Sequence, residues 1–269
     1  MPSSKGPPIP ILSVELPGIG SDSPLLVTTT REPFQPVRLY YDIPSRPFVT
    51  QRLSGLGCVV TDRTSNRLQW LYDGEASALP LEVASDQVPA AVRPVILGWL
   101  RFPKSGGLTI ELGSFRRAIA AARFFGPILG PRVVLVRARV INTCFGAGDG
   151  HPEALLRRLD QDVTVIDPVV AERQLEKDFE GVRTPEEAER VMQARMQSRL
   201  KSKRDVPLVE DFPLAPEEET PNFDHLATTL DLRTVRAVRR WSGEKDLTLT
   251  MVILELAQRM HEAGLTDLE

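Results

Sequence analysis

Residues 132–167 read RVVLVRARVINTCFGAGDGHPEALLRRLDQDVTVID, and this stretch decides the fold class. It predicts a long apolar strand over 132–144, a glycine-rich turn, a short helix that begins at Pro152 and a second strand over 163–166. Strands that alternate with helices of this length are typical of βαβ connections, in which helices cover at least one face of a sheet.

The flanking sequence predicts an α+β or α/β fold with several parts. A tail at 1–9 is rich in Pro, Gly and Ser and is expected to be disordered. The proline-rich segment 10–105 carries short β-type runs and is predicted to be mainly β. Residues 106–180 are expected to form the central βαβ-type sheet domain. Residues 181–269 are predicted to be helical, with an acidic linker at 205–222.

Capping signals place two of the helices. Ser114 is a good N-cap for a helix that ends near Phe125. The sequence Thr184-Pro185-Glu186-Glu187 is a capping box with proline at the first helical position, which predicts a helix to about Lys203. Apolar spacing predicts further helices over Leu232–Trp241 and Leu247–His261.

Composition favours a cytoplasmic protein. The chain is 42% hydrophobic with a net charge of −3, which argues against a nucleic-acid or membrane footprint of the whole protein. Cys58 and Cys144 have no metal-ligand or disulfide spacing and are expected to be reduced, mostly buried thiols. The first residues lack the apolar run of a signal peptide, and no apolar stretch is long enough to span a membrane. The usage of Arg, Ala, Pro and Val suggests a high-GC bacterium.

The glycine turn is a candidate ligand site. Gly146, Gly148 and Gly150 follow the predicted strand, and Asp167 comes 21 residues after the first of them, at the end of the next strand. The block resembles the first motif of Rossmann-like methyltransferases. The resemblance implies that the glycines face the methionine part of S-adenosylmethionine and that Asp167 binds its ribose. Cys144 stands where that family usually has an acid, and the later substrate motif is missing. The alternatives are another anionic ligand, such as a nucleotide, or a glycine-rich connection that binds nothing.

A basic run is the second candidate, as a nucleic-acid site. It comprises Arg195, Arg199, Lys201, Lys203 and Arg204. Such a run can follow a phosphate backbone, together with the arginines of 233–240. It can equally complement the helix dipole and be neutralised by the acidic residues of 205–219. Glu210 and Asp211 are interpreted as solvated linker charges.

Catalytic and metal signatures are sparse. His151, His225 and His261 lie in different segments, so no catalytic residue and no metal site is predicted. The favoured hypothesis is a non-enzymatic cytosolic protein that acts through protein–protein contacts of its C-terminal helices, with a protein partner or as a homo-oligomer and without a cofactor. The alternatives are an enzyme that uses S-adenosylmethionine or a nucleotide, and a nucleic-acid-binding accessory protein.

Overall fold

A computed structural model describes most of the chain. The described residues are 11–14, 24–62, 67–165, 173, 176–201, 205–214 and 223–262. The expected disordered tail at 1–9 lies outside them.

The centre of the molecule is an eight-stranded mixed sheet. Its strands, from edge to edge, are β4 (Val59–Thr61), β5 (Leu68–Leu71), β6 (Ile96–Arg101), β7 (Leu108–Leu112), β3 (Val37–Asp42), β8 (Val134–Ile141), β10 (Val209–Pro213) and β9 (Val163–Val165). Neighbouring strands are antiparallel except for β10 and β9, which are parallel. A separate antiparallel pair is formed by β1 (Ile11–Val14) and β2 (Leu25–Thr28).

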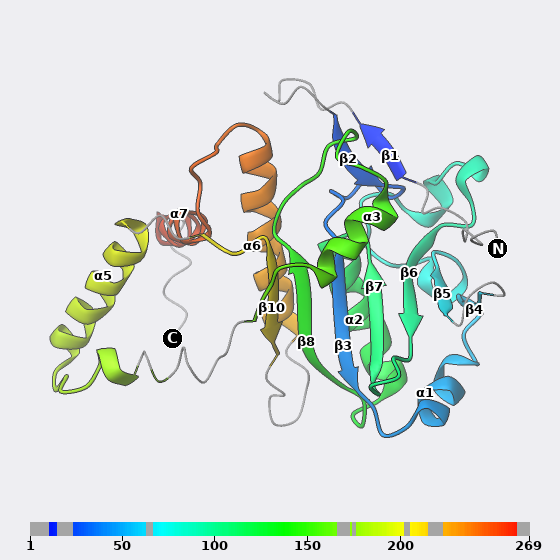
Figure 1. Ribbon diagram of the computed structural model, residues 1–269, viewed down its shortest axis with the longest axis horizontal. Helices are drawn as coiled ribbons and strands as arrows, with labels where there is room; N and C mark the ends of the chain where they lie inside the picture. Colours follow the sequence, from blue (N-terminus) through cyan, green and yellow to red (C-terminus); the bar gives the residue numbers. More distant parts are fainter. Residues whose placement is uncertain are drawn as a thin grey trace.

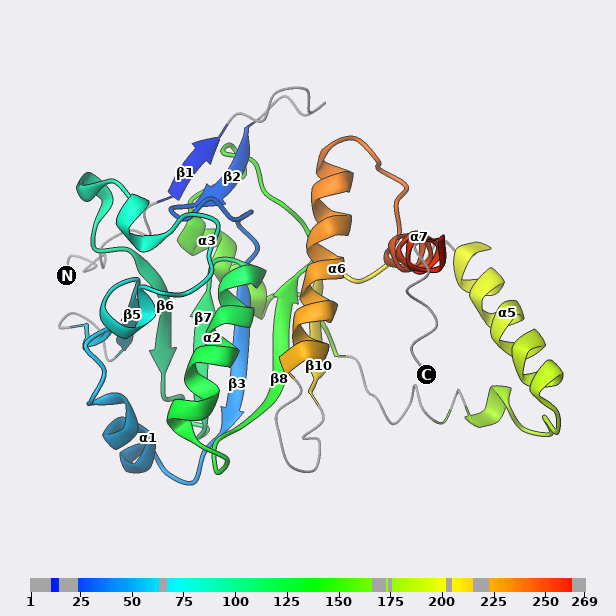
Figure 2. The ribbon, with the colours of Figure 1, turned by 180° about the vertical axis from the view of Figure 1, so that it is seen from behind.

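The helices are distributed unequally over the two faces of the sheet. The α-helices are α1 (Arg46–Leu53), α2 (Phe115–Leu129), α3 (Pro152–Arg157), α5 (Pro185–Lys201), α6 (Phe223–Trp241) and α7 (Leu249–Glu262). The short 3₁₀ helices are η1 (Gly74–Ala76), η2 (Ser85–Gln87), η3 (Ala90–Val92) and η4 (Arg158–Asp160). Figure 2 shows α2 and α6 across one face of the sheet. Figure 1, from the opposite side, shows α3 on the other face and α5 and α7 to the side of the sheet where β10 lies.

The main core lies between the sheet and the layer of α2 and α6. Leu39 of β3 and Ile110 of β7 pack there with Phe125 of α2 and Leu230 of α6, and all four are fully buried. Successive side chains of a strand point to opposite faces. The residues between these apolar ones, such as Arg38 of β3, therefore lie on the face that α2 and α6 do not cover.

The α+β class and the helical C-terminal segment are confirmed. The strands at 134–141 and 163–165 do not form the expected parallel βαβ unit. β10 lies between β8 and β9, antiparallel to the first and parallel to the second, so β8 and β9 run in opposite directions. The link through α3 and η4 is therefore not a parallel crossover.

β10 also corrects the expectation of a solvated acidic linker over 205–222. Glu210 and Asp211 are 0% and 3% exposed, respectively. Glu210 faces α6 and pairs with Arg233, while Asp211 faces the opposite side and pairs with Arg139. The strand alternation of the two carboxylates gives each a cationic partner, which makes their burial tolerable. Residues 215–222 lie outside the described part.

The helix-start predictions are confirmed. Ser114 caps α2 by accepting a hydrogen bond from the backbone N–H of Arg117 at 3.1 Å. Thr184 accepts one from the N–H of Glu187 at 3.2 Å, and the Glu187 carboxylate accepts one from the N–H of Arg183. Two boundaries differ: α2 continues through Gly126-Pro127 to Leu129, and α6 begins at Phe223 rather than at Leu232.

Two further properties follow from the side-chain environments. Cys58 and Cys144 are free and buried, and burial raises the pKa of each thiol to about 12. Within the part of the chain that the structure describes, no helix has the length and apolarity needed to cross a bilayer.

Candidate functional site

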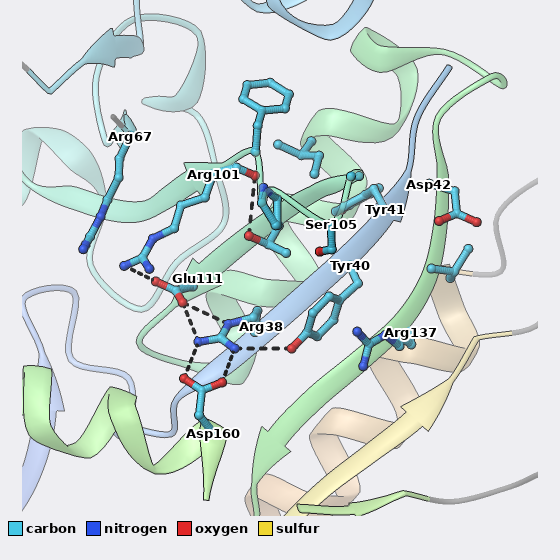
Figure 3. Close-up of a pocket in the computed structure, with 17 residues that line it drawn as sticks. Arg38, Tyr40, Tyr41, Asp42, Arg67, Arg101, Ser105, Glu111, Arg137 and Asp160 are labelled. Carbon is cyan, nitrogen blue, oxygen red and sulfur yellow. Dashed lines mark hydrogen bonds and ion pairs between the residues drawn. The ribbon is translucent and has the colours of Figure 1, made fainter. Parts of the chain in front are cut away.

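An open groove on the uncovered face of the sheet is the strongest candidate site. It has a volume of about 860 Å³. We call it the arginine groove, because its walls carry Arg38 of β3, Arg67 before β5, Arg101 of β6 and Arg137 of β8. The carboxylates of Asp42, Glu111 and Asp160 also line it. Figure 3 shows Arg38 in the middle of this arrangement, with Glu111 and Asp160 on its guanidinium.

Strand register brings these distant segments together. Arg38 lies opposite Glu111 of β7 on one side and opposite Arg139 of β8 on the other. One residue pair further along, Tyr40 lies opposite Thr109 and Arg137 in the same way. Directly opposed residues of neighbouring strands have adjacent side chains, so this face of the sheet forms a polar surface that carries arginines and carboxylates.

Glu111 holds two of the arginines. It accepts a hydrogen bond from Arg38 Nε at 2.9 Å on one oxygen, and its other oxygen lies 2.7 Å from Arg101 Nη2. The Glu111 side chain is only 7% exposed. It is therefore a fixed part of the groove wall that orients both guanidinium groups.

Asp160 binds Arg38 from the solvent side. Arg38 Nη1 and Nη2 donate to the two Asp160 oxygens at 2.6 and 3.2 Å. This hydrogen bond to Arg38 is the main reason that the pKa of Asp160 lies below its ordinary value. Burial by itself would lower the pKa of Arg38, but the bond to Asp160 and the charge of Glu111 outweigh it, so this pKa is raised.

The far wall of the groove is made by β8. The guanidinium carbon of Arg137 lies 3.6 Å from the centroid of the Tyr40 ring, which is cation–π geometry. Arg137 and its neighbour Arg139 both bind Asp211 of β10. The Tyr40 ring is thus covered by protein cations.

The β6–β7 loop forms the rim. Gly106 and Gly107 have φ angles of 95° and 80°, a region that disfavours other residues. A Cβ atom at Gly107 would lie 2.9 Å from the carbonyl oxygen of Tyr41, so the loop approaches β3 more closely than a side chain allows. Glycine here lets backbone form the edge of the groove.

The chemistry of the groove suits an anion. Guanidinium groups present planar forks that bind phosphate or carboxylate through two hydrogen bonds. Among the described residues, the Arg67 guanidinium of the groove wall forms no ion pair, and Arg101 pairs only with Glu111. The groove therefore has donor capacity beyond what its own carboxylates use.

The glycine turn is built differently. Gly146, Gly148 and Gly150 do lie together between β8 and α3. However, the Gly146 N–H donates to the Asp149 carboxylate at 2.7 Å, and the Ala147 N–H donates to the Pro24 carbonyl at 2.9 Å. These two donors of the turn are thus used inside the protein. Asp167 lies outside the described residues, so the ribose contact that the methyltransferase resemblance implies stays a prediction.

The basic run is only partly described. Arg195 pairs with Asp178. The side chains of Arg199 and Lys201, and the whole of Lys203 and Arg204, lie outside the description. The C-terminal arginines of α6 are ion-paired: Arg233 with Glu210, Arg236 and Arg240 with Asp205, and Arg239 with Glu244 and Glu255. The arginines of α6 therefore connect α6 to β10, to the segment before it and to α7.

Metal ligation has no clear centre in the residues that the structure covers, where no cluster of three or more His, Cys, Asp or Glu is suited to a metal ion. Among the histidines, His151 serves as the N-cap of α3. Comparison of the chain with protein-family models, curated proteins and solved structures gives no match.

The sequence analysis missed the arginine groove. One signal was available: Arg137 and Arg139 are two residues apart in a predicted strand, so they lie on the same face. The same spacing holds for Arg38 and Tyr40 and for Thr109 and Glu111. What the sequence does not contain is the register that puts these pairs side by side.

Proposed function

We propose that this protein binds a phosphate-bearing ligand in the arginine groove. The observation that supports the proposal is the convergence of four arginines from four separate segments on one cavity of about 860 Å³. Cavities of this size are typical of small-molecule sites. The ligand is therefore a small phosphorylated molecule, rather than an extended nucleic acid.

The excess of cations in the groove supports an anionic ligand. Four arginines and three carboxylates line the groove. A phosphate or diphosphate adds two or more negative charges and offers several acceptor oxygens to the guanidinium forks. A neutral ligand would leave the Arg67 guanidinium, which has no ion pair among the described residues, without a counter-charge.

Calorimetric titration with inorganic pyrophosphate tests the proposal. We expect binding by the wild-type protein that weakens as salt is added, because the groove is open to solvent. Arg38→Gln should weaken binding by about tenfold or more, since a hydrogen bond between charged groups contributes roughly 1.5–3 kcal/mol. Arg101→Gln, at a more exposed position, provides a second variant if Arg38→Gln does not fold.

Arg116→Gln is the matched control. Arg116 is an exposed arginine of α2, on the opposite side of the sheet. The Arg116→Gln variant loses the same charge as Arg38→Gln. An equal loss of affinity in the two variants would mean that pyrophosphate binding depends only on net charge. Absence of pyrophosphate binding by the wild type would refute the proposed function.

The exposed side of α7 supports a second candidate function, self-association. Leu249, Ile253 and Leu256 follow one another at spacings of four and three residues, the pattern of a helix that packs against another helix. Ile253 and Leu256 are 45% and 44% exposed. The helix is buried through Val252 on another side, so this stripe is open to a second copy of the chain.

Sedimentation equilibrium tests this candidate. The wild type should form dimers, and Ile253→Glu should be monomeric, because a buried unpaired charge is strongly unfavourable. Gln258→Glu adds the same charge on the opposite side of α7 and should leave the dimer intact. A monomeric wild type at high protein concentration would exclude the self-association model.

A further inference from the structure

We propose that Asp160 is an internal stand-in for the ligand's anionic group. Its carboxylate occupies the subsite formed by Arg38 and Arg139, and it leaves this subsite when a phosphate binds. This inference rests on the proposed function and assigns the position at which the phosphate is held.

The contacts of Asp160 define the subsite. Its two oxygens accept hydrogen bonds from Nη1 and Nη2 of Arg38 at 2.6 and 3.2 Å, and Arg139 Nη1 lies 3.6 Å from Oδ1. This is the two-point geometry in which an arginine binds two oxygens of a phosphate. When Asp160 leaves, the Nη1 and Nη2 donors of Arg38 face the groove (Figure 3).

The two carboxylates on Arg38 differ in how firmly they are held. Glu111 projects from the middle of β7, is 7% exposed and also binds Arg101. Asp160 ends the short 3₁₀ helix η4 and its side chain is 56% exposed. An exposed ion pair is weak because water solvates both partners when they separate. Asp160 can therefore be displaced by rotation of its side chain, while Glu111 keeps Arg38 in place.

Displacement needs no unfolding of the segment that carries Asp160. Leu159, the preceding residue, is fully buried with Leu155 of α3 and Val209 of β10. This anchor holds the backbone of η4 while the carboxylate turns toward solvent. A ligand with two or more negative charges is attracted by Arg38 and Arg139 together. This attraction replaces the electrostatic energy that is lost when the single charge of Asp160 moves away.

The test compares pyrophosphate binding by the wild type, Asp160→Asn and Asp162→Asn at the same ionic strength. Asp162 is an exposed aspartate two residues further along, outside the groove lining. Its φ of 47° is one that asparagine also tolerates. The Asp162→Asn variant therefore removes the same charge from the same turn without opening the Arg38 subsite.

We expect Asp160→Asn to lower the Kd by about fivefold, the fold-change that corresponds to release of an exposed ion pair. Asp162→Asn should change it by less than about twofold, because bulk salt screens its charge. Asp160→Ser provides a second variant if the asparagine variant does not fold.

The outcomes separate the two proposals. Binding by the wild type with equal or weaker binding by Asp160→Asn would overturn the stand-in assignment alone, because Asp160 would then only orient Arg38. Equal tightening in Asp160→Asn and Asp162→Asn would overturn it as well, since net charge would explain the effect. If neither the wild type nor any variant binds pyrophosphate, both proposals fail.

Discussion

Two arginine–carboxylate clusters of this protein share their chemistry and differ in their surroundings. The sealed cluster joins Arg117 of α2 to Glu32, and the two side chains are 1% and 2% exposed. The groove cluster joins Arg38 to Glu111 and Asp160, and the Asp160 side chain is 56% exposed. Each arginine binds a carboxylate that is distant in sequence, and the groove cluster borders an open cavity.

The donors of the sealed cluster are used entirely for structure. Arg117 donates to the hydroxyl groups of Thr29 and Thr30 at 3.1 and 2.8 Å and to the carbonyls of Ile96 and Leu97 at 3.2 and 3.4 Å. It thereby connects the segment after β2 to α2 and β6. Burial is the main reason that the pKa of Arg117 is lowered, whereas the pKa of Arg38 is raised by its carboxylates. Access to solvent therefore separates a structural arginine from one that can receive a ligand.

Loss of the sealed cluster should have the largest effect on stability. Arg117→Ala leaves Glu32 buried without its cation, and breaking such a pair costs about 3–5 kcal/mol. Urea unfolding of the purified variant measures this loss as a shift of the transition midpoint at constant slope. Because the penalty comes from the unpaired charge, Arg117→Met combined with Glu32→Gln should recover most of the lost free energy.

The double variant also serves as the control. Glutamine at position 32 can still accept the hydrogen bonds that Thr28 and Thr30 donate to Glu32. A double variant as unstable as Arg117→Ala would show that packing, rather than charge, dominates. If Arg117→Ala lowers the free energy of unfolding by less than about 1 kcal/mol, the Arg117 ion pair contributes no more than an exposed one. The contrast between the two clusters would then be lost.

The wall of the groove should be far less sensitive. Arg137→Ala removes an ion pair whose arginine is 39% exposed, and Asp211 keeps its bond to Arg139. We expect a loss of at most about 1 kcal/mol in the same urea experiment, including the stacking on Tyr40. A loss as large as that of Arg117→Ala would mean that the groove cluster holds the sheet together, which would contradict a ligand-binding role.

The sequence predicts those parts of the fold that depend on local signals. The N-cap at Ser114 and the capping box at Thr184 involve residues within a few positions of each other, so their helices begin where expected. The interior strands β3 and β7 are visible as short β-branched and apolar runs. β10 escapes detection because its sequence VEDFP has only two apolar side chains besides proline, and its carboxylates suggest a linker.

The candidate site could not be predicted in the same way. The groove depends on β3, β6, β7 and β8 being neighbours in an order that does not follow the chain. Arg38 and Asp160 are 122 residues apart, and no local sequence pattern links them. The glycine turn attracts attention in the sequence because its signal is local, but the N–H groups of Gly146 and Ala147 are used by the protein itself.

The smallest expected effect is the acid dependence of the Asp160 ion pair. Arg38 keeps the pKa of Asp160 in the folded protein below the value of about 3.9 that an aspartate has in an unfolded chain. The ionised carboxylate therefore stabilises the folded state above about pH 3.9, and this contribution is lost as the pH falls through the folded-state pKa. Because the side chain is 56% exposed, we expect the free energy of unfolding of the wild type to exceed that of Asp160→Asn by at most about 1 kcal/mol at neutral pH. Unfolding free energies measured from neutral pH into acid should show this difference shrinking toward zero. A difference that persists in acid would show that the carboxylate is held by contacts other than its charge on Arg38, and such an Asp160 could not give way to a ligand.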